Sequence, residues 1–587
     1  MFALLVPILF LSVGWFAHEP VSLFSSSVLF ILVLLAIILA KKLNWRASRL
    51  FLLALSLPLV YLISAIVNSQ SPTSLFLGGY QRNYGLATIL ALSLLFILSA
   101  NMKLDLGKYL NYGLLSTLVL ANIYGYLQYF DLDPLPWTNP FDAVSLTLGN
   151  PNFSGALFGM LSVVVFAKII TFKRASYKLA YLILLSSTIF LGFQTKSLQS
   201  QLLLVSSILV FLFIYSLGEV SRLFKLIRYS TSALLSISVV GLISIFGFSG
   251  FPRLKDIIFF QGSIPQRLDY WQNGINIWQD NLLFGVGADQ FQRYAALYRT
   301  PEQIIRDGNM VIPDKSHNVL IDHLANGGVI AGLIWLTFVI AIYFVLFKVV
   351  KGGHKSRVEI SILAGIWSAY VAQALISPDQ ILLSVIGYTS AGLILNEYLS
   401  KKESAIGAKL IKRNNPNYIR VCVALILLVS IVIFSRAISA NIAAKNMLDG
   451  KFLEVQSYLK VLDSWPNPFI NELLGVQLVK DQNNCQLTEL VADRLIKIDD
   501  RSSQGWFMKA ICSDFRGDYS KAIEFVNNSL KYDPLNLFYL ISKAELEIAD
   551  NRLTDALRTL SKVETINPLE PNLTRLEERI IYLNQTN

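Results

Sequence analysis

The most informative shortage in this chain is charge. Only 15% of its 587 residues are Asp, Glu, Lys or Arg, whereas 54% are apolar and the mean hydropathy is +0.52. Soluble domains carry about 25% charged residues, so this composition indicates an integral membrane protein. The net charge of +11 does not predict a nucleic-acid partner, because the Lys and Arg residues gather in short loops between apolar runs, where they encode membrane topology.

Cysteine is also scarce. The three cysteines, Cys422, Cys485 and Cys512, do not have the spacing of metal ligands, and a disulfide framework would need more of them in so long a chain. A single bridge between Cys485 and Cys512 is left open. The sequence also lacks a phosphate-binding loop of the Walker type, and its nearest glycine pattern, at 285–287, predicts no more than a turn.

Long apolar runs fill the first three quarters of the chain. Each is long enough to cross a hydrocarbon core of about 30 Å, and none shows the alternation that a β-barrel requires. We therefore predict an all-α, polytopic membrane helix bundle with about 12–13 transmembrane helices. The predicted spans lie near residues 2–17, 21–40, 50–67, 84–100, 109–130, 152–170, 177–194, 199–217, 231–249, 317–347, 358–376, 380–398 and 419–437.

Basic residues are abundant in every second loop and rare in the others. The stretch 41–49 holds four of them, for example, whereas 131–150 holds none. By the positive-inside rule, this asymmetry predicts a cytoplasmic N-terminus. It also places a large polar loop, at about 250–316, outside the cytoplasm. We predict that residues 1–437 form the membrane domain to which this loop belongs.

Residues 438–587 have the composition of a soluble helical domain and contain a repeat. Pro466, Asp500, Pro534 and Pro568 are each 34 residues apart, which is the tetratricopeptide period. We predict a tetratricopeptide-like α-solenoid that also lies outside the cytoplasm. It is interpreted either as a binding or positioning domain for a protein partner, or as a spacer.

His317 is the first candidate for chemistry. It stands at the start of an apolar run, where an ionisable group is costly unless it is used or partnered. Two interpretations stay open. In one, a neutral imidazole takes a proton from an acceptor hydroxyl. In the other, the histidine only begins a helix that Ser316 caps.

Three basic residues on the predicted outer side are further candidates. Arg267 is followed by Trp271 and Trp278 at helical spacing, which predicts an amphipathic helix in the membrane interface. Arg82 precedes the fourth predicted span, and Lys196 follows the seventh. All three side chains can bind phosphate. The alternative interpretation is a snorkelling anchor for Arg267 and a role in topology for the other two.

Five segments within roughly residues 1–435 together resemble the O-antigen ligase and O-antigen polymerase superfamily. They are RNYGL at 82–86, GNPN at 149–152, RLDYW at 267–271, NLLFGVGADQF at 281–291 and SHNVLIDHLANGGVIAG at 316–332.

The resemblance implies a membrane glycosyltransferase. Its donor would be a glycan on undecaprenyl diphosphate, its acceptor a hydroxyl at the outer face of the cytoplasmic (inner) membrane, and its reaction inverting, with no metal or other cofactor. By resemblance, His317 activates the acceptor, and Arg267 and Arg82 hold the diphosphate. The family often has a Ser-Arg pair where this chain has Lys196-Ser197, so Lys196 is carried over as a phosphate ligand that lacks the bidentate grip of arginine.

Several functions stay open at this point. The first is a ligase that acts on a glycan, lipid or protein acceptor. The second is a polymerase that extends a lipid-linked glycan. The third is a non-catalytic, membrane-anchored tetratricopeptide scaffold or a transporter, although a transporter would favour broken or charged helices at mid-membrane. Membrane lipids surround the bundle in every case.

Overall fold

The structure is all-helical, as predicted, with no β-strand among the residues that it describes. The computed structural model describes residues 4–12, 22–39, 48–79, 82–101, 106–135, 141–217, 221–247, 263–352, 357–406, 417–448, 459, 463–468, 472, 474–476, 479 and 485–586. The first part of the predicted polar loop, up to residue 262, and most of the region before 485 therefore lie outside the described residues.

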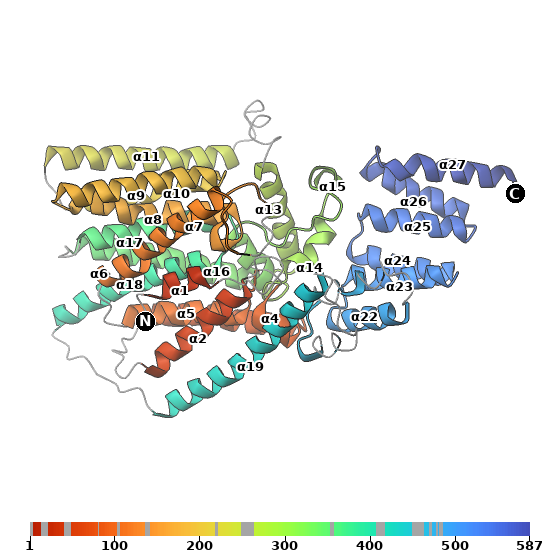
Figure 1. Ribbon diagram of the computed structural model, residues 1–587, viewed down its shortest axis with the longest axis horizontal. Coiled ribbons are helices and arrows are strands. Elements are labelled where there is room, and N and C mark those ends of the chain that lie inside the picture. Colours follow the sequence, from red (N-terminus) through yellow and green to blue (C-terminus); the bar gives the residue numbers. More distant parts are fainter. Residues whose placement is uncertain are drawn as a thin grey trace.

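The helices fall into a bundle and a C-terminal array (Figure 1). The bundle begins with α1 (Leu5–Leu11), α2 (Leu23–Leu39), α3 (Arg49–Val67), α4 (Pro72–Leu77), α5 (Leu86–Asn101), α6 (Leu106–Lys108), η2 (Tyr109–Leu115), α7 (Ser116–Tyr129), η3 (Leu146–Leu148), α8 (Pro151–Thr171), α9 (Ala175–Gln194), α10 (Leu198–Ser216) and α11 (Arg222–Gly247). It continues with α13 (Ser263–Asp280), α14 (Phe291–Ala295), η4 (Ala296–Tyr298), α15 (Pro301–Asp307), α16 (Val319–Lys351), α17 (Arg357–Ala374), α18 (Ile381–Ile406) and α19 (Asn417–Leu448). The array consists of α22 (Cys485–Ile498), α23 (Ser503–Phe515), α24 (Tyr519–Tyr532), α25 (Leu537–Ala549), α26 (Leu553–Ile566) and α27 (Pro571–Thr586).

The centre of the bundle is α8, which packs against α9, α10 and α17. Glycine makes the closest of these contacts feasible. A Cβ atom at Gly159 would lie 2.5 Å from the backbone carbonyl oxygen of Ser200 in α10. Small residues let helix backbones approach closely, which is how helices associate where lipid replaces water.

The bundle is a multi-pass membrane domain. Large apolar side chains lie exposed on its outer helices, for example Leu52 (72% exposed) and Ile66 (71%) on α3, which lipid accommodates and water does not. Each predicted span overlaps a helix. The prediction of about 12–13 crossings stays a prediction, because the shorter α2 and α5 are apolar but have fewer than 18 residues. Seven helices among the described residues are long and apolar enough to cross a membrane, namely α3, α8, α9, α10, α16, α18 and α19.

The helix α16 is broken near its beginning. The sequence predicts one uninterrupted span over 317–347, but Gly328 has φ 70° and ψ −173°, a conformation that side-chain-bearing residues essentially never adopt. The break exposes the backbone amide of Val329, which donates a hydrogen bond to the carbonyl oxygen of Leu282 at 2.8 Å. The first turns of α16 are thus separated from its long membrane-crossing part.

The glycine pattern at 285–287 fills this break. The backbone amide of Val286 donates to the carbonyl oxygen of Ala325 at 3.0 Å, and that of Gly287 donates to Asn326 at 2.9 Å. These carbonyls end the first part of α16 and lack helical partners, so the loop supplies the missing donors. The pattern thus belongs to a turn, as predicted, and this turn also closes a helix end from a distant part of the chain.

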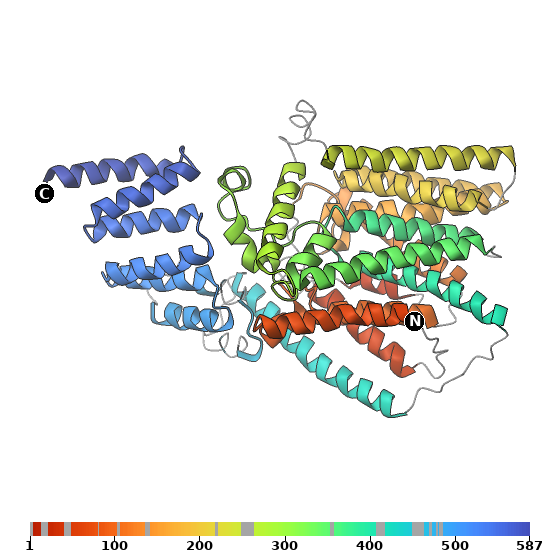
Figure 2. The same ribbon diagram turned by 180° about the vertical axis from the view of Figure 1, so that it is seen from behind.

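The C-terminal helices stack in an array at one end of the bundle (Figure 2). Each of α22 to α26 packs against the helix that follows it. The buried alanines Ala510, Ala522, Ala544 and Ala556 lie in the hydrophobic clusters between these helices. The tetratricopeptide assignment itself stays a prediction. So does the predicted domain boundary at 437/438, which falls inside α19.

The three cysteines form no disulfide. Cys512 is buried, and its thiol instead donates a hydrogen bond to the carbonyl oxygen of Cys485, with the sulfur 3.6 Å from that oxygen. The bridge that the sequence left open is thus not made.

A buried ion pair docks the array on the bundle. Arg299 Nη2 lies 2.6 Å from Asp533 Oδ1, and both side chains are almost completely buried. Nearby, the side chain of Asn309 accepts a hydrogen bond from the backbone amide of Leu537 at 2.7 Å. Ile304 of α15 joins a hydrophobic cluster of the array. These contacts fix the array beside the segment that connects α13 to α16.

Replacing Gly328 by Ala is expected to disrupt the junction with α16. An added Cβ would lie 2.1 Å from the carbonyl oxygen of Leu283, so we expect a loss of about 3 kcal/mol or more from strain and clash together. The measurement is the thermal unfolding midpoint in detergent. Gly308→Ala is the control, since its φ is +101° but its Cβ would meet only Val311 Cγ2, at 3.7 Å. Equal losses would contradict a steric role for this junction.

Replacing Arg299 by Ala is expected to loosen the array. The change leaves Asp533 buried without its partner, which costs about 3–5 kcal/mol. Limited proteolysis should then release the C-terminal fragment sooner. Arg558→Ala is the matched control, because its pair with Asp555 is exposed and contributes at most about 1 kcal/mol. If both variants resist the protease as the parent does, the buried pair does not hold the array.

Candidate active site

The loop between α4 and α5, which carries Arg82, is organised by one carboxylate. Asp289 Oδ2 accepts hydrogen bonds from the backbone amides of Gly79 at 2.7 Å and Tyr84 at 3.1 Å, one on each side of Arg82. Asp289 is 9% exposed and forms an ion pair with Lys315, which is also buried. Because an unpaired buried charge is costly, these contacts favour the observed positions of Gly79 and Tyr84, which flank Arg82.

The segment 314–318 carries the candidate histidine and is held on several sides. Asp314 forms an ion pair with Arg82. The backbone amide of Ser316 donates to Asp322 Oδ1 at 2.8 Å. The side chain of Asn318 caps α16 by accepting from two backbone amides of its first turn. The predicted cap, Ser316, is therefore wrong by two residues, since the chain becomes helical only after Asn318.

His317 lies between these anchors with a backbone φ of +60°, which is uncommon for a residue with a side chain. Its ring lies against Tyr270 of α13, with 5.3 Å between the ring centroids. Its carbonyl oxygen accepts a hydrogen bond from Trp271 Nε1 at 3.4 Å. Gly274 lets α13 approach this closely, because a Cβ atom there would lie 2.5 Å from Ile321 Cγ2.

Arg267, on α13, faces the beginnings of α8 and α10. With the Gln199 amide oriented to satisfy both of its neighbours, its oxygen accepts from Arg267 Nη2 at 3.2 Å and its nitrogen donates to the Asn152 carbonyl at 3.2 Å. Ser197 Oγ donates to the side-chain oxygen of Asn152 at 2.7 Å. Burial lowers the pKa of Arg267, and no carboxylate among the described residues offsets this effect. A partly buried guanidinium without a counter-ion favours an anionic ligand.

The structure brings Arg82, Arg267 and His317 together. Burial lowers the pKa of His317 to about 4, Asp314 opposes the shift, and the guanidinium groups of Arg82 and Arg267 add to it. The imidazole is thus uncharged at neutral pH, and the charges of two arginines act on it. This arrangement can accept a proton next to a bound anion.

Lys196 stands apart from this group. Its Nζ lies 2.6 Å from Asp142 Oδ2, and its side chain is 60% exposed. It makes no contribution to the pKa of His317, in contrast to both arginines. Its neighbour Ser197 nevertheless contacts Asn152, so the Lys196-Ser197 pair borders the site through the serine and not through the amine.

Sequence reasoning missed the charged residues that support the site. Asp314 and Lys315 directly precede Ser316-His317. Two adjacent opposite charges just before an apolar run could have indicated that these residues support the site. Burial disfavours the charged form of Lys315, yet the carboxylates around it, Asp289 first, raise its pKa. The ion pair of Lys315 with Asp289 could not be inferred from the sequence. The two residues are 26 positions apart, and only the folded structure shows that they meet.

Comparison with known proteins gives one match. Residues 161–336 match the family model described as O-antigen ligase. The match runs from α8 into α16 and contains Lys196, Arg267 and His317, whereas Arg82 precedes it. No curated protein matches the chain. The resemblance to the O-antigen ligase superfamily is thus confirmed by the family match at residues 161–336. This match does not extend to the C-terminal array.

The low pKa of His317 can be tested without knowing the substrate. Hydrogen–deuterium exchange at the imidazole C2 position, followed by mass spectrometry, should titrate with a midpoint of about 4, well below the usual value of about 6.5. Arg267→Gln removes a nearby positive charge and should raise the midpoint. Asp314→Asn removes a negative one and should lower it.

Arg306→Gln is the control for this titration. Arg306 is bound to Asp269 and Asp307 and does not act on His317, so the midpoint should stay unchanged. A midpoint near 6.5 in the parent protein would show that His317 is solvated and unaffected by the two arginines.

Proposed function

Because the chain carries an O-antigen ligase domain, which points to glycan transfer in a membrane, we propose that it moves a glycan from undecaprenyl diphosphate to an acceptor hydroxyl. The reaction takes place at the outer face of the cytoplasmic membrane. The observation that carries this proposal is the neutral His317, whose pKa the charges of Arg82 and Arg267 lower, together with Arg267 itself, which has no carboxylate partner among the described residues. A base and an anion site side by side are what displacement of a diphosphate requires.

The diphosphate binds Arg267 first, because this guanidinium has no carboxylate partner among the described residues. The N-termini of α8 and α10 lie beside it through Asn152 and Gln199, and helix N-termini favour anions. Arg82 adds a second positive charge that Asp314 and the face of Phe153, 5.3 Å from the guanidinium carbon, hold in position. Lys196 is a further phosphate ligand only if its amine leaves Asp142.

His317 acts on the acceptor. It takes the hydroxyl proton as the acceptor oxygen attacks the anomeric carbon, and the bond to the diphosphate breaks with its electron pair going to the phosphate oxygen. Attack from the opposite side inverts the anomeric configuration. A bound diphosphate neutralises the arginines that lower the pKa of His317, so donor binding itself makes the imidazole a stronger base.

The geometry of the bundle supports one outer face. In both views the array and α13 lie at the same end of the long helices (Figures 1 and 2). The loops predicted at the other end are rich in Lys and Arg, which favours the cytoplasm there. We accordingly place the N-terminus in the cytoplasm, and the active site and the array outside it.

A polymerase is the second candidate within this class, with a lipid-linked glycan as acceptor. It would use the same three side chains, so the site alone does not separate the two. A scaffold or transporter without catalysis gives no reason for a desolvated histidine on which the charges of two arginines act, and we propose neither.

Replacing His317 by Ala is expected to reduce glycan transfer by at least about 100-fold, because it removes the base. Arg267→Lys should keep the charge but lose the bidentate grip on phosphate, and so weaken donor binding. The measurement is transfer from a purified lipid-linked donor by protein in detergent, with donor binding recorded separately. His317→Ala should bind the donor normally, whereas Arg267→Ala should not.

Arg306→Lys is the control, since its partners Asp269 and Asp307 lie outside the proposed site. Full activity of His317→Ala would overturn the proposal. The products separate the two enzyme types: ladders of repeats on the lipid carrier indicate a polymerase, and a glycan on another acceptor indicates a ligase.

A further inference from the structure

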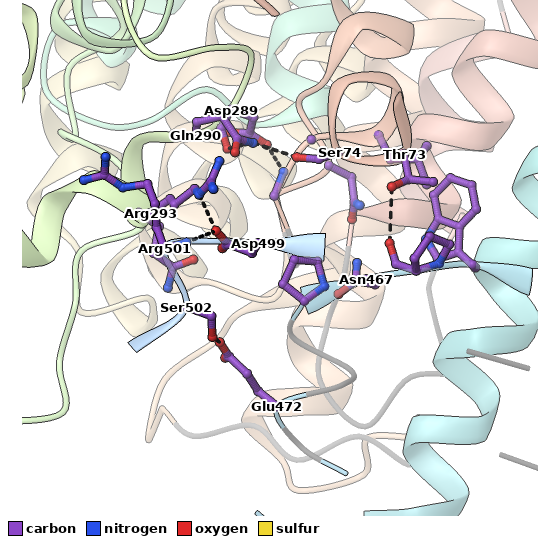
Figure 3. A pocket seen from close by; sticks show the side chains of 18 of the residues that line it. Thr73, Ser74, Asp289, Gln290, Arg293, Asn467, Glu472, Asp499, Arg501 and Ser502 are labelled. Atoms are coloured by element: carbon purple, nitrogen blue, oxygen red, sulfur yellow. Dashed lines mark hydrogen bonds and ion pairs between the residues drawn. The ribbon is translucent and has the colours of Figure 1, made fainter. Parts of the chain in front are cut away.

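A cavity of about 290 Å³ lies where the bundle meets the array. One wall comes from α4 and the loop that follows it, from α14 and from α19. The other comes from residues 465–468, the loop between α22 and α23, the first residue of α23 and the last residue of α24. Figure 3 shows side chains of both parts, such as Ser74 and Gln290 from the bundle and Asn467 and Asp499 from the C-terminal region, around one space. Neither part of the chain forms this cavity alone.

Two buried amide oxygens in this lining have no hydrogen-bond partner among the residues that the structure describes. Asn83 is 7% exposed and Asn441 is 6% exposed, and no described donor reaches the side-chain oxygen of either. Asn441 uses its nitrogen to donate to the carbonyl oxygen of Ala437 at 2.9 Å, which leaves the oxygen as the unsatisfied group. Buried acceptors of this kind call for a ligand with O–H or N–H donors.

Most charges of the lining lie in ion pairs, and the guanidinium of Arg501 lies over the rings of Tyr294 and Tyr532. Arg293 binds both Asp499 and Asp500, which ties α14 to the array. Asp289 binds Lys315. Burial and the neighbouring Asp499 raise the pKa of Glu472 to about 7, so near neutral pH this carboxyl is partly protonated and can donate as well as accept a hydrogen bond.

The remaining lining suits an uncharged, hydroxyl-rich molecule. The lining combines neutral hydrogen-bonding side chains with the rings of Trp465 and Tyr532. Sugars bind to such surfaces through their hydroxyl groups and the apolar faces of their rings. The cavity is at the lower end of the roughly 300–1,000 Å³ typical of ligand sites, so it holds a short part of a chain. The neutral polar side chains are Thr73, Ser74, Asn83, Gln290, Gln292, Asn441, Asn467, Ser502 and Ser503.

The cavity also adjoins the proposed active site. Asn83 lines it directly after Arg82 in the sequence, and Asp289, which fixes the loop around Arg82, lines it as well. We infer that this junction cavity is a binding site for the glycan portion of the acceptor, which the bundle and the array grip together. The inference rests on the proposed function and adds to it the chemical class of the acceptor.

A photo-crosslinker at Tyr532 tests what occupies the cavity in the full-length protein in its native membrane. p-Benzoylphenylalanine preserves an aromatic ring there, and the same residue at Tyr582, on the outermost helix α27, is the control. Irradiation should give a carbohydrate-positive, protease-resistant adduct only from position 532. A polypeptide adduct, a lipid adduct, or equal labelling at both positions would overturn the inference.

The same crosslink in the His317→Ala background separates this inference from the proposed function. Binding of an acceptor does not need the base, so the adduct should persist when transfer is lost. If the adduct forms but His317→Ala remains active, the proposed mechanism fails and the binding site stands. If transfer behaves as proposed and no carbohydrate adduct forms at position 532, the binding site fails alone.

Kinetics provide an independent measure. Asn441→Leu removes an unsatisfied oxygen and narrows the cavity, so we expect the KM for the acceptor to rise at least about tenfold, with kcat and the KM for the donor little changed. Asn441→Ala, which leaves the space open, should have a smaller effect. An unchanged acceptor KM in Asn441→Leu, with normal thermal unfolding, would contradict the inference.

Discussion

Two neighbouring ion pairs determine the geometry of the site. Asp314 binds Arg82 and Lys315 binds Asp289, so adjacent residues of one segment attach to two other parts of the chain. Asp289 in turn holds the backbone of the loop that carries Arg82. Buried pairs of this kind contribute little net stability but penalise every arrangement that leaves a charge alone. Their effect is therefore to specify one position for the residues around His317.

The break at Gly328 makes this arrangement compatible with a membrane. An uninterrupted helix would carry the first turns of α16 along the axis of the membrane span. The break instead frees two carbonyls, which the loop at 286–287 satisfies, so no backbone group is left unpaired at the junction. The long part of α16 crosses the bundle, while its short beginning anchors His317 through the cap at Asn318.

The sequence predicted what depends on composition and local pattern. Apolar length located the helices. His317 was identified because an ionisable group is costly at an apolar boundary, and Arg82 and Arg267 because they are basic residues on the predicted outer side. The sequence did not predict the partners of these residues. Asp289 follows the loop that docks where α16 breaks at Gly328, and the sequence did not predict this break, because glycine in an apolar run is as compatible with close packing as with a break. The cap moved from Ser316 to Asn318 for a related reason, since both residue types cap helices equally well.

The position of the array suggests one explanation for the polar groups near the site that have no partner among the described residues. Among the described residues, Arg267 has no carboxylate partner, and the side-chain oxygens of Asn83 and Asn441 have no hydrogen-bond donor. Buried groups of this kind are suited to a ligand that supplies the missing partner. An anion suits the position beside Arg267, and a hydroxyl-rich molecule suits the position beside Asn83 and Asn441. The diphosphate-linked donor and the glycan acceptor of the proposed transfer have these two properties. The buried pair of Arg299 and Asp533 then has a functional consequence, because it holds the second half of the acceptor cavity against the first.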